Sequence, residues 1–99
     1  MMKVRNMVSN RSGRAVANQF VMVGDNKAIF QSYDSIICVI DYTKEGAERI
    51  TLGRDWDYSV TTAKYLHQFL SEYANMNANA KGLRIAIKNH DIAYDENLR

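Results

Sequence analysis

The chain has 99 residues with a formal net charge of +2, and 46% of the residues are hydrophobic. This length predicts a single domain, 1–99, with a modest core, and the balanced charge excludes a disordered chain and an acidic mimic of DNA. A lone cysteine excludes an internal disulfide framework, and no apolar segment is long enough to span a membrane or to serve as a secretory signal. We therefore expect a cytoplasmic protein.

The first half of the chain predicts an antiparallel sheet of four or five strands, within residues 3–53. Short runs of alternating or β-branched residues are separated by turn clusters of Gly, Asn, Asp and Ser. The expected strands are 3–9, 14–23, 28–33, 36–42 and 48–52. The short connections favour antiparallel pairing, and the fourth run is the most hydrophobic and should be central.

A long amphipathic helix is predicted over residues 60–74, beginning after Ser59, whose hydroxyl is a good N-cap. Gln68 is expected on the outer face of this helix, with Lys64 among others. Apolar side chains at helical spacing form the inner stripe: Ala63, Tyr65, Leu66, Phe69, Leu70 and Tyr73. Because a helix of this length is marginal alone in water, it should lie on the sheet, with Trp56 and Tyr58 packed at the joint.

A second helix is predicted over residues 79–89, capped by Asn77 or Asn79. Leu83 would then face the core. The expected fold class is α+β, an antiparallel sheet of four or five strands with both C-terminal helices packed on one face.

The residues do not form a recognisable catalytic or metal-binding set. His67, His90 and Cys38 show no ligand spacing, and the glycines are isolated rather than grouped in a phosphate loop. Asp55 and Asp57 form a carboxylate pair, but their place before a helix fits interaction with the helix dipole. We therefore expect a protein without enzymatic activity, without a metal and without a cofactor.

The N-terminal segment indicates a binding surface more clearly than any residue set indicates a catalytic or metal site. Residues 1–24 contain four basic residues and no acidic one, and the basic ones are Lys3, Arg5, Arg11 and Arg14. If they share a face of the first hairpin, they form a patch for phosphates or for an acidic protein surface. The same charges also fit a solvated hairpin that protects a sheet edge, so both interpretations stay open.

A second group of candidate partner-binding residues is Arg54, Trp56 and Tyr58. These residue types anchor protein interfaces, and exposed rings could also stack on single-stranded bases. At these positions, however, burial of the rings between sheet and helix is the competing interpretation.

The sequence also resembles a family of short proteins from phages, prophages and plasmids. The resemblance lies in FQSYDSII (30–37), ITLGRDWDYS (50–59), TTAKYLHQFL (61–70) and the opening VSNRSGRAVANQF (8–20). It covers roughly residues 3–70, and the tail after Tyr73 departs from the pattern. The resemblance implies no catalytic residues. It implies an accessory protein in a host bacterial cell that binds a defence complex or nucleic acid stoichiometrically.

Three hypotheses follow from these observations. The first is an anti-defence inhibitor, for example an anti-CRISPR protein, that occludes a surface of a host protein or nucleoprotein complex. The alternative is a basic nucleic-acid-binding module that uses the N-terminal hairpin. The third is sequestration of a small nucleotide signal at an oligomer interface. No membrane partner is expected, and homodimerisation stays open because Phe20, Met22 and Val23 suggest a strand covered on both sides.

Overall fold

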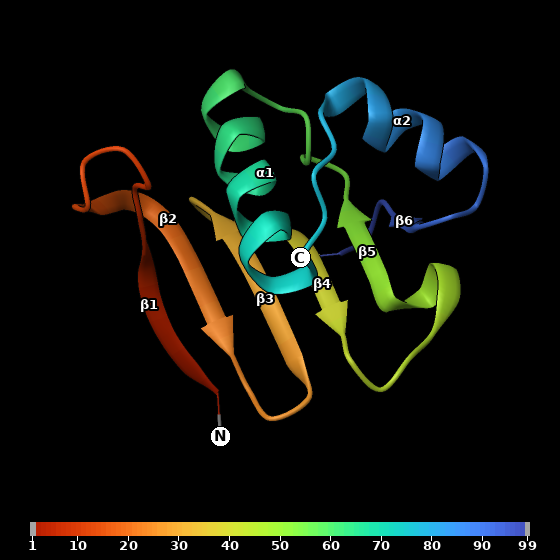
Figure 1. Ribbon diagram of the computed structural model, residues 1–99, viewed down its shortest axis with the longest axis horizontal. Helices are drawn as coiled ribbons and strands as arrows, with labels where there is room; N and C mark the ends of the chain where they lie inside the picture. The colour runs from red at the N-terminus through yellow and green to blue at the C-terminus, as the bar shows by residue number, and fades with distance from the viewer. Residues whose placement is uncertain (1, 99) are drawn as a thin grey trace.

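The computed structural model describes residues 2–98, and in this part of the chain six strands form one sheet with two α-helices (Figure 1). The strands are β1 (Lys3–Val8), β2 (Ala15–Val23), β3 (Lys27–Ser32), β4 (Ser35–Asp41), β5 (Ile50–Gly53) and β6 (Ala93–Asp95). They lie in the sheet in chain order, β1-β2-β3-β4-β5-β6. The first five pair antiparallel, whereas β6 pairs parallel with β5.

The predicted α+β class and the helix-after-strand order are confirmed. All five expected strands are present, and a 3₁₀ turn (η1, Gly46–Arg49) precedes β5. The sixth strand was not expected, and it makes the sheet mixed rather than purely antiparallel. A parallel pair needs a crossover connection, and the two helices between β5 and β6 provide it.

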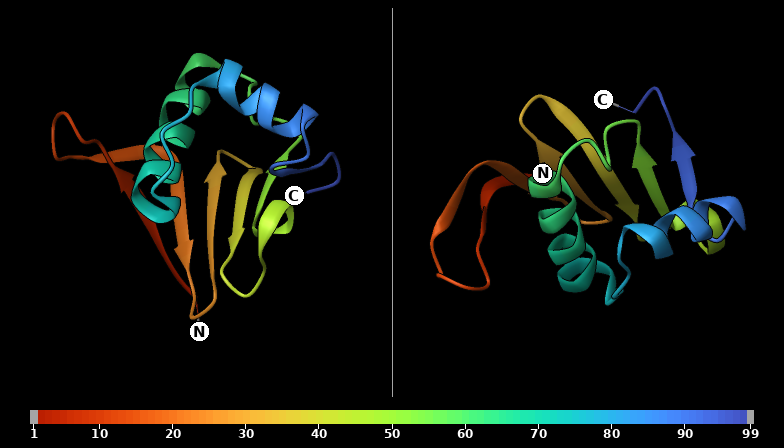
Figure 2. Two further views of the ribbon diagram at one scale, coloured as in Figure 1. Left: turned by 45° about the vertical axis from the view of Figure 1, so that its right-hand side comes forward. Right: turned by 90° about the horizontal axis from the view of Figure 1, so that it is seen from above.

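Both helices cover the same face of the sheet (Figure 2). Helix α1 (Val60–Ala74) lies over β3 and β4, and α2 (Ala80–Lys88) follows it after a short connection. Between α1 and the sheet, the Phe69 ring stacks on Phe30 with 5.7 Å between ring centroids. Leu66 and Leu70 on α1 and Leu83 on α2 are fully buried. The predicted apolar stripe of α1 is therefore the side of the helix that forms the core.

The prediction that Gln68 lies on the outer face of α1 was wrong, because its side chain is buried. Its amide nitrogen donates to the carbonyl of Val8 at the end of β1 and to the Glu72 carboxylate. The strand end leaves a backbone acceptor beside the helix, and a long amide side chain satisfies it. Helical spacing alone could not show that acceptor.

The face of the sheet opposite the helices is covered by no element of residues 2–98 (Figure 2). Strand register defines its side chains, because directly paired residues on neighbouring strands point to the same side. One row across the sheet is Val4, Met22, Ile29, Val39 and Thr51, and the next is Asn6, Phe20, Gln31 and Ile36. We call these nine residues the open sheet face. No helix within residues 2–98 is long and apolar enough to cross a membrane.

Candidate functional site

The loop between β5 and α1 joins the sheet to the helical layer. Trp56 is buried there, as predicted, and the guanidinium of Arg84 on α2 lies 5.5 Å from the centre of its ring. Arg84 also pairs with Asp57 at 3.3 Å, so this loop and α2 are tied together. The prediction that Tyr58 packs between sheet and helix was wrong, because this residue is 81% exposed. The burial of Trp56 fills the joint, which leaves Tyr58 pointing outward two residues later.

Helix α1 begins with a network of three hydroxyl groups. The Ser59 hydroxyl accepts a hydrogen bond of 3.0 Å from the N–H of Thr62 and donates to the Thr62 hydroxyl at 3.1 Å. The Thr62 hydroxyl also shares a buried hydrogen bond of 3.0 Å with Ser32 at the end of β3. The predicted N-cap at Ser59 is confirmed, and it anchors the helix to the sheet as well as capping it. Asn79 caps α2 in the same way, accepting from the N–H of Gly82 at 2.8 Å.

Replacing Ser59 with alanine should lower the free energy of unfolding by about 1 kcal/mol, within a range of about 0.5–2 kcal/mol, because the Thr62 N–H loses its acceptor. Urea unfolding followed by circular dichroism measures this loss. Ser71→Ala is the matched control, since Ser71 lies exposed in the same helix. A loss at Ser59 no larger than the loss at Ser71 would show that the cap does not stabilise the helix.

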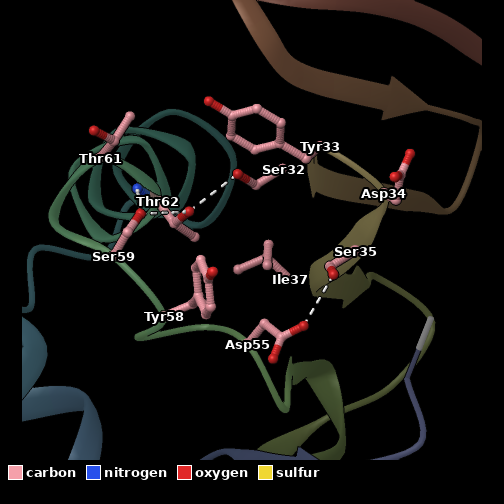
Figure 3. Close-up of a pocket in the computed structure, with 10 residues that line it drawn as sticks. All are labelled: Ser32, Tyr33, Asp34, Ser35, Ile37, Asp55, Tyr58, Ser59, Thr61 and Thr62. Carbon is pink, nitrogen blue, oxygen red and sulfur yellow. Dashed lines mark hydrogen bonds between the residues drawn. The ribbon is translucent and has the colours of Figure 1, made fainter.

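A hollow of about 630 Å³ opens where the β3–β4 turn meets the start of α1 (Figure 3). Ile37 is the aliphatic side chain of its lining, and Tyr33 and Tyr58 lie on opposite sides of the hollow. The remaining lining residues are Ser32, Asp34, Ser35, Asp55, Ser59, Thr61 and Thr62. Hydroxyl groups and carboxylates therefore dominate its polar surface.

The charges in this hollow limit what it could bind. Asp34 and Asp55 are acidic, and among the described residues that line it none is basic. Asp55 accepts from the Ser35 hydroxyl at 2.9 Å and pairs with Arg54 at 3.3 Å, so its carboxylate is held in place. An anionic ligand would meet like charge here. The chemistry suits a neutral or cationic group that can donate hydrogen bonds.

The four basic residues of the predicted N-terminal patch lie on β1 and on the β1–β2 turn. Lys3, Arg11 and Arg14 are exposed. Arg5 is also exposed but is engaged by α1, because its guanidinium contacts the Tyr73 hydroxyl and lies 5.9 Å from the centre of the Tyr73 ring. Since β1 is the first strand of the sheet, one of its edges has no strand beside it within residues 2–98. The patch is therefore an edge of the sheet, with three of its four cations directed to solvent.

The two groups of predicted partner-binding residues do not form one surface. Arg54, Trp56 and Tyr58 follow β5, and β5 is separated from β1 by four inter-strand spacings, or about 19 Å. Trp56 is buried, and Arg54 is paired with Asp55, so only Tyr58 is a free aromatic anchor in this group. The basic edge is the larger of the two candidate surfaces.

The described residues give no metal-ligand cluster: within residues 2–98, no three His, Cys, Asp or Glu side chains gather closely enough to hold an ion. His67 contacts the backbone carbonyl of Ala78 through its Nδ1 and so joins α1 to the segment before α2. Cys38 is fully buried, and this burial raises the pKa of its thiol. A thiol that stays protonated is a poor nucleophile and a poor metal ligand.

Two candidate binding surfaces were not predicted from the sequence. The hollow of Figure 3 combines three separate segments of the chain, so no local motif indicated it. The open sheet face was indicated only in part, because Phe20, Met22 and Val23 suggested a strand covered on both sides. Apolar residues at both odd and even positions of a strand indicate contact on both faces of the sheet. Ile29 and Val39 show the same pattern on the next two strands.

The architecture and its surfaces define a small α+β protein with one helix-covered and one uncovered sheet face. A family model described as a family of unknown function (DUF8033) matches residues 2–86, and the chain belongs to this family. Searches of curated proteins and of solved structures found no match. Strand β6 lies beyond the segment that the family model covers.

Proposed function

We propose that this chain is a non-enzymatic binding protein that acts by stoichiometric contact with a host protein or nucleoprotein complex. Its most specific form is an anti-defence inhibitor of mobile-element origin, for example of a CRISPR effector. The observation that carries the proposal is the basic edge at β1 and the β1–β2 turn, where Lys3, Arg11 and Arg14 are exposed. The sequence resemblance to small phage proteins supplies the biological context.

A basic edge strand supports binding in two ways. Its unpaired backbone groups can add to a strand of a partner, and its cations steer the encounter and select an acidic surface. Residues 1–24 contain no acidic side chain, so the attraction of this edge for an acidic surface is not offset locally. The inhibitor would therefore contact an acidic part of the complex or its bound nucleic acid, and would not imitate nucleic acid in a basic channel.

The test is co-purification of the tagged chain from a defence-proficient host, followed by titration with the recovered partner. Reversing two charges in Arg11→Glu/Arg14→Glu should weaken binding about tenfold or more, mainly through a slower association rate. Lys81→Glu/Lys88→Glu on α2 is the matched control, since it changes the net charge equally at another exposed surface. Equal weakening by both variants would contradict a role for the basic edge, and recovery of no protein partner would contradict inhibition.

Nucleic-acid binding is the second candidate, and the same four cations favour it. If three or four of them contact phosphates of duplex DNA, the logarithm of the binding constant should fall with the logarithm of salt concentration with a slope of about −3. Electrophoretic or fluorescence titrations at several salt concentrations measure this slope. A binding constant that does not change with salt concentration, or no binding at low salt, would exclude nucleic-acid binding.

Sequestration of a small nucleotide is a weaker candidate because of the charge of the hollow beside α1. Its two carboxylates would repel a phosphate group. A thermal-shift screen addresses this directly, since a ligand that binds only the folded chain raises Tm. A rise in Tm with a nucleotide that is abolished by Tyr58→Ala would favour this candidate over the other two.

A further inference from the structure

The open sheet face has an apolar surface that is unusual for a solvated sheet. An antiparallel sheet with one face in water normally carries polar side chains on that face. Here the row of paired residues across β1 to β4 is Val4, Met22, Ile29 and Val39, without a charge. Val4 is 64% exposed, and the other three are only partly buried. The face therefore presents a continuous apolar strip to whatever lies against it.

The size of the whole open sheet face supports an interaction. Five strands at a spacing of about 4.8 Å, each contributing about 17 Å of length, span an area of roughly 400 Å². An exposed apolar patch of a few hundred Å² on a protein surface often marks a site of interaction. The patch also contains a hollow of about 550 Å³ over β3, β4 and β5, whose floor includes Ile29, Ile36 and Val39.

The rim of this hollow carries charges of both signs. Its bases are Lys27 and Lys44, and its acids are Asp41, Glu48 and Asp95. Hydrogen bonds from the Thr43 hydroxyl and N–H lower the pKa of Asp41, which favours its charged form. A rim that carries both signs is complementary to another surface that also carries both signs.

We propose that the open sheet face is the contact surface for a second copy of this chain. A two-fold axis through the hollow places the rim opposite an identical rim, where each base can face an acid of the other copy. The apolar floors of the two copies then pack against each other, which removes them from water. A nucleic acid would instead require a basic rim, and this one contains more acids than bases. This inference goes beyond the proposed function and is tested without any host partner.

The first experiment measures the mass of the purified chain by light scattering and sedimentation equilibrium over a range of concentrations. The wild-type chain should dimerise, and Val39→Glu should raise the dimer dissociation constant roughly a hundredfold or more, because a two-fold contact buries the new charge twice. Val39→Thr keeps the β-branched shape and should raise it by a smaller factor, and circular dichroism checks that both variants fold. Ile85→Glu is the matched control, since Ile85 is exposed on α2 at the other face. A monomer at every concentration, or a dimer that withstands Val39→Glu, would overturn the proposal.

A charge-swap experiment separates a second copy from any other occupant. Lys27→Glu/Lys44→Glu makes the rim wholly acidic, and Glu48→Lys/Asp95→Lys makes it predominantly basic. Each variant alone should dissociate at concentrations where the wild type is dimeric, and an equimolar mixture should form the heterodimer. Failure of the mixture to associate, with both variants folded and monomeric, would show that the rims do not face each other.

Discussion

Replacing Phe69 with alanine should lower the free energy of unfolding by about 3–5 kcal/mol, a large share of the stability of a domain of this size. Phe69 is fully buried in α1. Its ring stacks on Phe30 and lies 5.1 Å from the ring of Tyr73, measured between centroids. Removing it leaves a cavity between helix and sheet and deprives both neighbouring rings of a partner.

Urea and thermal unfolding measure this effect, and Tm should fall by about 15 °C or more. Val60→Ala is the control in the same helix, since Val60 is 87% exposed and should change stability by no more than about 0.5 kcal/mol. A loss below about 1 kcal/mol at Phe69 would contradict the placement of α1 on the sheet.

Replacing Gly53 with alanine should destabilise the chain by about 1–3 kcal/mol or more, although only one methyl group is added. A Cβ atom at this position would lie 2.5 Å from the carbonyl oxygen of Ile36 on β4 and 3.4 Å from the Leu98 side chain. The carbonyl belongs to the backbone and cannot move without disturbing β4. The end of β5 must therefore shift, which would weaken its pairing with β6 at Gly53 and Asp95.

Gly82→Ala is the matched substitution with the opposite expected sign. Gly82 lies in the first turn of α2, where a Cβ atom would meet its nearest neighbours at 3.4 and 3.6 Å. Alanine there should stabilise the chain by about 0.5–1 kcal/mol, because glycine lowers helix stability. Urea titrations of both variants give the comparison. Two equal changes of the same sign would show that the close approach at Gly53 does not constrain the fold.

The helices could be predicted almost to the residue because two independent signals agreed. The 3.6-residue period placed the apolar stripe of α1, and Ser59 marked where that helix begins. For α2 the sequence offered Asn77 or Asn79 as the cap, and the structure uses Asn79. The first five strands were predictable because turn residues separate them and each pairs with its neighbour in the chain. Local sequence is sufficient where a structure is made of local contacts.

Sequence reasoning failed where distant segments decide the outcome. Strand β6 has only three residues and no period, and its formation depends on the edge that β5 offers. Gln68 is buried because a carbonyl at the end of β1 needs a donor, and Tyr58 is exposed because Trp56 fills the joint. Each of these results depends on a neighbour that is far away in the sequence or on competition for one space.

The candidate surfaces also differ in whether one local segment or several distant segments form them. The basic edge could be predicted because its four cations lie in one short segment without acids. The hollow beside α1 unites the β3–β4 turn, the loop after β5 and the first turn of α1, so no single segment indicated it. The position of Tyr33 in its wall also depends on an uncommon left-handed backbone conformation, with φ of 53°.

The parallel pairing of β6 with β5 affects how the chain assembles. Every other strand pair is linked by a short connection, whereas both helices lie in the chain between β5 and β6. Closing so long a loop costs more conformational entropy than closing a hairpin, and the only strand pairing gained is that of the three residues of β6. We therefore expect β6 to pair only after the other strands and the helical layer have formed, and to be the first strand of the sheet to separate.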